Sequence, residues 1–592
     1  MSRRTKQADR GFERPDVVIL GAGLAGLCLA RQLLLETDRT ILMLERREEV
    51  PSERQKVGEA TVQVSGYYLS KVLDLEEYLL REHFMKYNLR FYWRTWADGV
   101  PAPGDRFEDY SQSYIRGLSN IASYQLNRNT LEAELLRRNL EDPRFRFEGG
   151  VKKLEVELAT KDGVRAAGEP HRVAFETSRD GGVRREVAAT WVVDTTGRGK
   201  FLAKKLGLAK PNDIRHGAFF WWVDGLVDVE KLTDSSPREV RLNPARRHIG
   251  HLPFWLATNH FCGEGYWFWV IPLQGKTSLG LVFDNRTVDP SDVFSVEKAC
   301  AWICREHPLF ARDLPHRKVL DFAGFRDFSY DCAQTISADR WALAGEAGRF
   351  TDPLYSPGGD LISIYNTLIV AAIDTDDPAE LESRCRISEQ IMRAAYSAYV
   401  PGYALSYDTL GDQEVYSLKY TWELATYFAA YVFPFINDLF TDRRFATSFL
   451  RLFSRLGPVN RSLQPFLSSY YQWKKAHRPD GVRPGTPVFF DFTEIGTLRE
   501  AEKTFYEVGV PVEEARRILT RQVENLEELA RFIGAHAASV VLDDPRVVTS
   551  RRFVEGIDPA ALAFDPEGFA ERWRECLAVE EAAGEGGEAQ PW

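Results

Sequence analysis

The spacing of hydrophobic residues predicts several buried strands, and one of them is GYWFWVIPL (265–273). Side chains on a strand alternate between its two faces. One face of this strand would therefore carry Trp267, Trp269 and Ile271. Pro272 lacks the N–H that a central ladder needs, so it marks the end or the edge of the strand. Such an aromatic face is typical of an ordinary core and also of a cavity that holds an aromatic ligand.

The hydrophobic pattern changes along the chain. Residues 145–190 and 214–330 contain short alternating runs separated by turns, which indicates β-sheets. After about residue 379 the apolar residues recur at helical spacing, with many aromatic residues among them. A Pro/Gly-rich stretch at 477–487 separates these helices from a last amphipathic pair. The C-terminal part is therefore predicted to be mostly α-helical.

A glycine turn near the N-terminus predicts dinucleotide binding. DVVILGAGLAGLCLARQLLL (16–35) is a short apolar strand, a G-x-G-x-x-G turn and a helix. The first glycine permits the tight turn, the second lets the backbone approach a pyrophosphate, and the third lets helix and strand pack closely. A second strand (40–47) ends at an acid that is well placed to accept hydrogen bonds from a ribose. The predicted binding residues here are Gly21, Gly23, Leu24, Ala25, Gly26, Glu45 and Arg46.

Composition and charge limit the classes of partner that we expect. The 592 residues carry a formal net charge of −10 with no long basic run, so a nucleic acid is not expected to bind. The seven cysteines are scattered and odd in number, which indicates neither a disulfide framework nor a metal site. No signal peptide and no apolar run of membrane-spanning length are apparent. We therefore expect a soluble, cytoplasmic protein that does not bind membranes.

Three later segments resemble those of the flavoprotein monooxygenases, which implies that the dinucleotide is FAD. They are YQLNRNTLEAELL (124–136), WVVDTTGRGK (191–200) and RWALAGEAGRFTDPLYSPGGD (340–360). The family usually has an aspartate where this chain has Glu346. With the VGEAT segment at 57–61, the resemblance implies FAD contacts from Gly58, Glu59, Ala60, Arg128, Asp194, Gly345, Glu346, Pro353, Gly358 and Gly359.

The fold class that follows is α/β. We predict a Rossmann-like FAD-binding domain with an inserted mixed or antiparallel β-sheet substrate domain, followed by a mostly α-helical C-terminal region. The predicted boundaries are a disordered N-terminus at 1–14, the FAD-binding domain at 15–213 and 331–378, the substrate-side sheet at 214–330, the helical domain at 379–580, and a disordered tail at 581–592.

Two further motifs resemble the flavin-dependent halogenases within that superfamily. The tryptophan strand fits the halogenase pattern W-x-W-x-I-P, which is thought to keep the organic substrate away from the flavin. The segment 57–93 starts V-G-E-A-T and carries a lysine four residues before an Arg-Phe pair, as the family does. The resemblance covers about residues 15–375 and implies catalytic roles for Lys86, Trp267, Trp269 and Ser356.

The resemblance also implies a reaction. Reduced FAD, O₂ and chloride would give hypohalous acid, which Lys86 would direct to an electron-rich aromatic carbon. The halide-binding amides of the family follow a serine, here Ser356. Pro357 has no N–H, so the halide would need the amides of Gly358 and Gly359. A glycine-rich turn without a ligand fits these residues equally well.

One departure points to the substrate. Tryptophan halogenases carry a glutamate where this chain has Tyr355, and a tyrosine cannot act as a carboxylate. A phenol needs less help because its own oxygen donates electron density to the ring. The resemblance therefore favours the halogenases of phenols and aromatic polyketides, which act in natural-product biosynthesis, over those of tryptophan.

The expected partners follow from this interpretation. They are a small aromatic substrate, O₂, and a separate NAD(P)H-dependent flavin reductase, since no NADH-binding unit is apparent. Whether the substrate is free or presented on a carrier protein stays open. Two alternatives also stay open: a flavin-dependent aromatic hydroxylase, and a non-catalytic flavin-binding partner in a biosynthetic complex.

Overall fold

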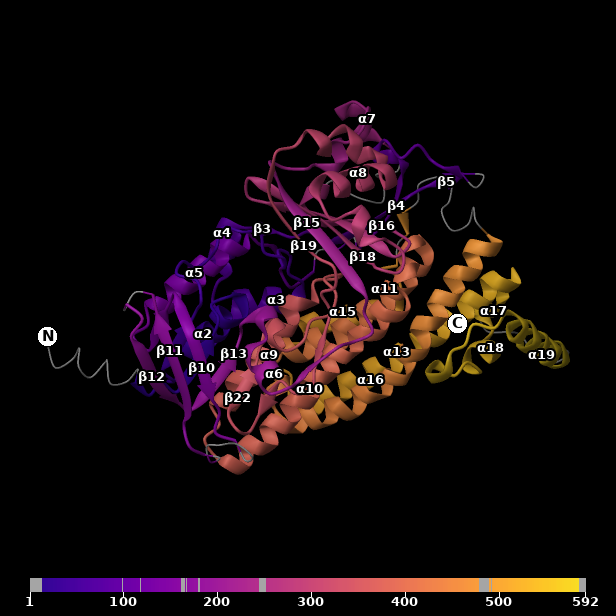
Figure 1. Ribbon diagram of the computed structural model, residues 1–592. Helices are drawn as coiled ribbons and strands as arrows, with labels where there is room; N and C mark the ends of the chain where they lie inside the picture. Colours follow the sequence, from indigo (N-terminus) through magenta and orange to yellow (C-terminus); the bar gives the residue numbers. More distant parts are fainter. Residues whose placement is uncertain are drawn as a thin grey trace.

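The fold is seen in a computed structural model of the chain (Figure 1). The structure describes residues 13–97, 100–115, 117, 119–160, 166, 168–178, 181–243, 252–478, 489–490 and 492–584. The predicted N-terminal and C-terminal disorder falls mostly at 1–12 and 585–592, and most of the predicted break at 477–487 falls at 479–487. These stretches lie outside the described residues.

A six-stranded sheet forms the Rossmann-like part. Its order is β21-β22-β13-β1-β2-β9, and all neighbours pair in parallel except β21 with β22. The strands are β1 (Val17–Leu20), β2 (Ile41–Leu44), β9 (Phe145–Glu148), β13 (Trp191–Asp194), β21 (Ile336–Ser337) and β22 (Trp341–Leu343). Helices α2 (Leu24–Glu36), α5 (Arg128–Leu140) and α9 (Pro357–Ile373) pack together beside it. The predicted fold class is confirmed.

A small antiparallel sheet follows β9 in the chain. It consists of β10 (Val151–Glu157), β11 (His171–Thr177) and β12 (Arg184–Ala189). These strands match the strand-rich character predicted for residues 145–190. Half of the RDGG turn (179–182) lies outside the described residues.

The second large sheet has eight strands in the order β19-β15-β18-β17-β16-β4-β7-β23. Its strands are β4 (Leu89–Arg94), β7 (Tyr110–Ser113), β15 (His216–Asp224), β16 (Thr258–Gly263), β17 (Tyr266–Leu273), β18 (Lys276–Asp284), β19 (Val319–Phe325) and β23 (Phe489–Phe490). The sheet is mixed, because β16 pairs with β4 in parallel and β17 pairs with both neighbours antiparallel. It therefore draws strands from outside residues 214–330, and the domain boundaries stay a prediction.

Strand β17 has the two buried faces that the alternation predicts. Every residue from Tyr266 to Leu273 is buried. One face, with Trp267 and Trp269, joins the largest core cluster. The other face, with Phe268, joins a second cluster that includes α8 (Val296–Glu306). Figure 1 shows α8 on one side of this sheet and the C-terminal helices on the other. The strand ends one residue after Pro272.

Long helices make up the C-terminal part and pack side by side (Figure 1). They include α10 (Pro378–Leu405), α11 (Gln413–Tyr427), α13 (Arg443–His477), α16 (Val512–Leu542) and α19 (Pro566–Gly584). A π-helical turn, η12 (Phe428–Val432), continues α11 into α12 (Phe433–Ile436). None of the described helices is long and apolar enough to cross a membrane.

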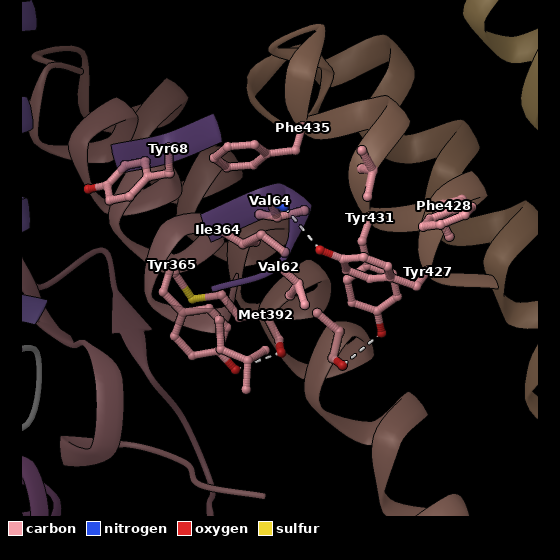
Figure 2. Close-up of a cluster of buried hydrophobic side chains, with 14 of the residues drawn as sticks. Val62, Val64, Tyr68, Ile364, Tyr365, Met392, Tyr427, Phe428, Tyr431 and Phe435 are labelled. Atoms are coloured by element: carbon pink, nitrogen blue, oxygen red, sulfur yellow. Dashed lines mark hydrogen bonds between the residues drawn. The ribbon is translucent and has the colours of Figure 1, made fainter. Parts of the chain in front are cut away.

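The C-terminal helices are joined to the flavoprotein-like part by a shared core (Figure 2). There the side chains of α11, η12 and α12 meet those of α9 and of the segment around α3 (Gln63–Tyr67). The hydroxyl of Tyr427 accepts a hydrogen bond from the backbone N–H of Val64 at 3.0 Å. The hydroxyl of Tyr365 donates to the backbone carbonyl of Met392 at 2.8 Å. The helical region is thus part of the same core as α9 and not a separate body.

Candidate active site

The glycine turn after β1 has the geometry that its sequence predicts. Gly21 adopts φ +104°, a conformation that favours glycine. A Cβ on Gly26 would lie 2.4 Å from the carbonyl oxygen of Gly21, so helix α2 packs tightly against the turn. A Cβ on Gly23 would meet no atom within 4 Å. The turn is therefore closed on its inner side and open at Gly23, where a pyrophosphate would approach.

A first cavity, of about 1150 Å³ including its mouth, extends from α2 toward the eight-stranded sheet. Residues from widely separated segments form its walls. Those predicted from the sequence as site residues are Leu24, Gly58, Glu59, Ala60, Arg128, Trp267, Trp269, Gly345, Glu346, Pro353, Ser356, Gly358 and Gly359. The structure thus brings both tryptophans of the W-x-W motif to the same cavity as the predicted flavin-contacting residues.

Trp267 and Trp269 form one wall of the first cavity, the tryptophan wall, and hydrogen bonds hold both indoles in place. The indole Nε1 of Trp267 donates to the Tyr407 hydroxyl at 2.5 Å, and that of Trp269 donates to Ser278 Oγ at 3.2 Å. The ring of Trp269 lies across Gly280 of the neighbouring strand, where a Cβ would come within 2.2 Å of the indole. The indoles are therefore fixed by hydrogen bonds and by the missing side chain opposite them.

Glu59 is the centre of a buried polar network in the same cavity wall. Its carboxylate accepts hydrogen bonds from Trp222 Nε1 at 2.6 Å and from Ser278 Oγ at 2.5 Å. Burial raises the pKa of Glu59 to about 7, although both hydrogen bonds favour the charged form. Because Ser278 also accepts from Trp269, Glu59 helps to orient the tryptophan wall. The sequence motif V-G-E-A-T gave no sign of this link.

Arg128 lies at the N-terminus of α5 and is anchored on two sides. Its guanidinium donates to the Val57 carbonyl oxygen and to Glu132, both at 2.6 Å. Gly58 adopts φ +94°, and a Cβ there would lie 2.9 Å from the guanidinium. The arginine is thus held in the cavity wall, where the sequence predicts it to lie.

Seven predicted cofactor contacts do not line the first cavity: the three glycines of the turn, Ala25, Glu45, Arg46 and Asp194. Glu45 directly follows β2, and its carboxylate accepts hydrogen bonds from the backbone N–H groups of Ala22 and Arg47, both at 2.9 Å. The two carboxylate oxygens of Asp194 accept hydrogen bonds from the backbone N–H groups of Thr196 and Leu202. Arg46 is exposed, and the backbone oxygen of Ala25 accepts from Asn366. Their roles toward a cofactor stay predictions.

Lys86 lies in a second cavity of about 660 Å³, including its mouth. It follows the short strand β3 (Phe84–Met85) and is 4% exposed. The amine nitrogen makes no hydrogen bond within the described part of the chain. Burial lowers the pKa of Lys86 to about 7, opposed by the charge of Asp360. Lys86 therefore lies outside solvent, and its burial favours the neutral amine.

Tyr355 and Ser356 stand between the two cavities. Ser356 lines the first cavity and Tyr355 lines the second. Both residues adopt positive φ, +67° for Tyr355 and +59° for Ser356. Two consecutive left-handed residues that are not glycine store strain, which is often found at functional sites. The strain turns the serine toward one cavity and the tyrosine toward the other.

The segment after Ser356 begins helix α9. Pro357 is its first residue, followed by Gly358 and Gly359. A Cβ on Gly359 would lie 2.9 Å from Ser65 Cβ, so a side chain does not fit there. Both glycines line the first cavity, at a helix N-terminus that favours anions. Halide binding by their amides stays a prediction.

A third cavity, of about 2050 Å³ including its mouth, lies among the C-terminal helices. Its aromatic lining comes mostly from α10, α11 and η12. It includes Tyr399, Tyr403, Trp422, Tyr427 and Tyr431. Tyr355, Tyr399, Glu423 and Tyr427 also line the cavity of Lys86. The many aromatic residues in the sequence of these helices are the sign of this cavity that the sequence offers.

Curated relatives of the chain carry halogenase names. The flavin-dependent halogenase chlA of Dictyostelium discoideum is 26% identical over 363 residues, which cover 59% of this chain and 58% of that protein. Tetracycline 7-halogenase of Kitasatospora aureofaciens is 26% identical over 413 residues, covering 64% of this chain and 67% of that protein. The chain is related to the flavin-dependent halogenases. The family resemblance inferred from the sequence is thereby confirmed, although no protein-family profile matches the chain.

Solved halogenase structures share the fold. Halogenase PltM aligns with a TM-score of 0.57 at 17% identity, covering 87% of this chain and 96% of that chain. Its complex with phloroglucinol and FAD aligns equally well. The chain spans about 58% of the length of the first curated relative, the Dictyostelium discoideum halogenase chlA. The glycine turn and the first cavity are the predicted places of the two halves of an FAD molecule.

Proposed function

We propose that this protein is an FADH₂- and O₂-dependent halogenase that installs a halogen, most simply chlorine, on an electron-rich phenolic or polyketide ring. One observation carries the proposal. The buried amine of Lys86, which has no hydrogen-bond partner among the described residues, lies in a cavity next to the first cavity, which has the tryptophan wall and reaches Leu24, the first residue of α2 after the glycine turn. Bound reduced FAD supplies the reaction of oxygen with halide that yields hypohalous acid.

Residues of the first cavity and residues of the second cavity would carry out different parts of the reaction. The tryptophan wall keeps an aromatic substrate out of the first cavity, and its indoles are fixed by Tyr407 and Ser278. The amides of Gly358 and Gly359 are the candidate halide donors. Tyr355 and Ser356 form the partition through which only a small neutral molecule passes. Lys86 receives that molecule on the substrate side.

The protonation state of Lys86 suits its proposed role of receiving hypohalous acid. With a pKa of about 7, the amine is partly neutral at physiological pH, so both a nucleophilic and a hydrogen-bonding form exist. A neutral amine forms an N–halogen bond with hypohalous acid and releases water. A protonated amine donates a hydrogen bond to the acid's oxygen. Either form directs the halogen toward a ring in the second cavity.

The substrate class rests on the aromatic lining and on Tyr355. Tyr355 and Ser356, which form the partition, carry no carboxylate, and this favours a ring that carries its own hydroxyl. The name of tetracycline 7-halogenase is compatible with this class. A Pseudomonas fluorescens relative is named as a chlorinase of 1H-pyrrole-2-carbonyl on a peptidyl-carrier protein, whose ring is electron-rich but not a phenol. A separate flavin reductase would supply FADH₂, and presentation on a carrier protein remains a second mode of delivery.

The test is a halogenation assay. The purified protein, FAD, a flavin reductase with NADH, and chloride are incubated with a set of phenols and polycyclic polyketides, and the products are measured by mass spectrometry. The proposal expects a product that gains the mass of chlorine for hydrogen only when chloride, oxygen and reductase are all present. A gain of oxygen mass without halogen would instead show an aromatic hydroxylase. Absence of any FADH₂ oxidation by the protein would leave a non-catalytic flavin-binding partner.

A further inference from the structure

Four polar side-chain atoms in the lining of the Lys86 cavity have no hydrogen-bond partner within the described residues. They are Lys86 Nζ, Asn88 Oδ1, Glu423 Oε2 and the hydroxyl oxygen of Tyr355. Buried polar atoms are nearly always paired, so atoms left free in one cavity point to a ligand. Two of the four, on Asn88 and Glu423, can only accept a hydrogen bond. A ligand that donates a hydrogen bond near the lysine would satisfy the acceptors.

Glu423 is held by only one of its two oxygens. It belongs to α11, and its Oε1 accepts from Lys419 Nζ at 2.6 Å and from Gln464 Nε2 at 3.3 Å. The side chain of Lys419 is only 2% exposed, so its positive charge stays beside the carboxylate. The pairing fixes the carboxylate and balances its charge while Oε2 remains free. Glu423 Oε2 is therefore positioned to accept a hydrogen bond from a ligand.

The neighbouring helix makes room for this carboxylate. Gly402 lies inside α10, where glycine costs about 1 kcal/mol relative to alanine. A Cβ at Gly402 would lie 2.3 Å from Glu423 Oε1 and 3.4 Å from Lys419 Nζ. The missing side chain therefore allows the ion pair to sit against the helix backbone. This gives a way to move the carboxylate without removing it.

Asn88 supplies the second acceptor. It adopts φ +72°, and its Nδ2 donates to the Ile115 carbonyl oxygen at 2.8 Å. That bond fixes the amide and leaves its oxygen free in the cavity. Glu423 also lines the larger aromatic cavity of the C-terminal helices. Glu423 is therefore shared by the larger cavity and the Lys86 cavity.

We propose that Glu423 is a catalytic residue that accepts a hydrogen bond from a phenolic hydroxyl of the substrate, with Asn88 as a further acceptor in the same cavity. This inference rests on the proposed halogenase function and supplies, from α11, a carboxylate in the Lys86 cavity where position 355 has a tyrosine. As the ring carbon bonds to the halogen, the halogen–oxygen bond of hypohalous acid breaks with its electron pair on oxygen, and Glu423 takes up the proton of the ring hydroxyl. The ring then loses its C–H proton to the released hydroxide, which becomes water, and Glu423 returns the hydroxyl proton to the ring oxygen. The balance is ArH + HOX → ArX + H₂O.

The test compares a phenol with its methyl ether. Binding of 1,3,5-trihydroxybenzene and of 1,3,5-trimethoxybenzene to the full-length, FAD-loaded protein is measured by calorimetry without reductase. Glu423→Gln keeps the shape but weakens the acceptor, so the phenol should bind about tenfold to a hundredfold more weakly. The ether has no hydroxyl to donate, so its binding should stay unchanged. Glu513→Gln, at a position that is 74% exposed on α16, is the control.

Gly402→Ala is the second variant, because it keeps the carboxylate and displaces it. It should weaken phenol binding in the same direction and leave the ether unaffected. An equal loss for both probes would mean a structural role and overturn the inference, as would unchanged phenol binding in both variants or a parent that binds no phenol. A parent that binds the phenol selectively but never halogenates it would remove the proposed function while the Glu423 site stands.

Discussion

Burial gives single side chains in this protein properties that their sequence neighbours do not reveal. Lys86 and Asp360 are both buried, and burial moves the pKa of each to about 7, downward for the amine and upward for the carboxyl. Glu59 has the same pKa for the same reason. Three groups that titrate near neutrality thus line or adjoin the two cavities. Such clusters are typical of functional sites.

Removing the amine of Lys86 is expected to stabilise the fold. In Lys86→Met the apolar stem remains and the free-energy cost of burying the amine is removed, so the variant should be more stable than the parent at pH 6.5 by on the order of a few kcal/mol. The folded-state pKa of Lys86, about 7, lies below its ordinary value of 10.5. Between these values the unfolded chain binds the proton and the folded protein does not, so the parent gains stability as the pH rises. The advantage of the variant should therefore shrink toward pH 10.

Thermal unfolding of FAD-free parent and variant at pH 6.5 and pH 9.5 checks this expectation. The exposed lysine Lys71, which pairs with Glu76, provides the control variant Lys71→Met. A Lys86→Met protein that is less stable than the parent at both pH values would contradict the account of a desolvated amine.

At the scale of elements, local motifs predicted local geometry well. The G-x-G-x-x-G turn and the alternation of the tryptophan strand both follow from neighbours within a few residues. What the sequence left open was which distant segments meet. Strands β4 and β7 join the eight-stranded sheet, and Glu423 of α11 reaches the Lys86 cavity. These contacts depend on packing between elements far apart in the chain, for which periodicity carries no information.

The glycine turn gives a prediction at this scale. A side chain at Gly23 meets open space in the protein, so Gly23→Val should fold with a melting temperature close to the parent's when FAD is absent. It should nevertheless bind FAD at least about a hundredfold more weakly, because the side chain blocks the approach of the pyrophosphate. Flavin fluorescence titration measures the affinity. Gly496→Val, also in open space but on α15 (Gly496–Lys503), is the control. Unchanged FAD affinity in Gly23→Val would remove the dinucleotide assignment.

The tryptophan wall gives a second prediction at the scale of elements. A Cβ at Gly280 would lie 2.2 Å from the Trp269 indole, so Gly280→Ala must displace that ring. Overpacking of this kind costs about 1–3 kcal/mol of stability. The displaced ring should also intrude on the first cavity and weaken FAD binding. Denaturant unfolding and flavin titration measure the two effects. A variant with the parent's stability and affinity would show that the wall is not packed as described.

At the scale of the whole molecule, three cavities lie in sequence from the Rossmann-like part to the C-terminal helices. The first and second are separated by Tyr355 and Ser356, and the second and third share Tyr355, Tyr399, Glu423 and Tyr427. The shared core of Figure 2 fixes the C-terminal helices against α9 and the Lys86 side of the site. Cofactor binding and substrate binding are thus assigned to opposite ends of one connected interior.

The central claim is that the flavin half and the Lys86 half of this interior do separate parts of one reaction. The most direct measurement is a paired assay of Lys86→Met, with Lys71→Met as control, in the presence of reductase, chloride and a phenolic substrate. Oxygen uptake and substrate chlorination are recorded in the same reaction. The account predicts parental FAD affinity and oxygen uptake, with chlorination reduced by about 10²- to 10⁴-fold. A folded Lys86→Met protein that chlorinates at the parental rate would contradict it.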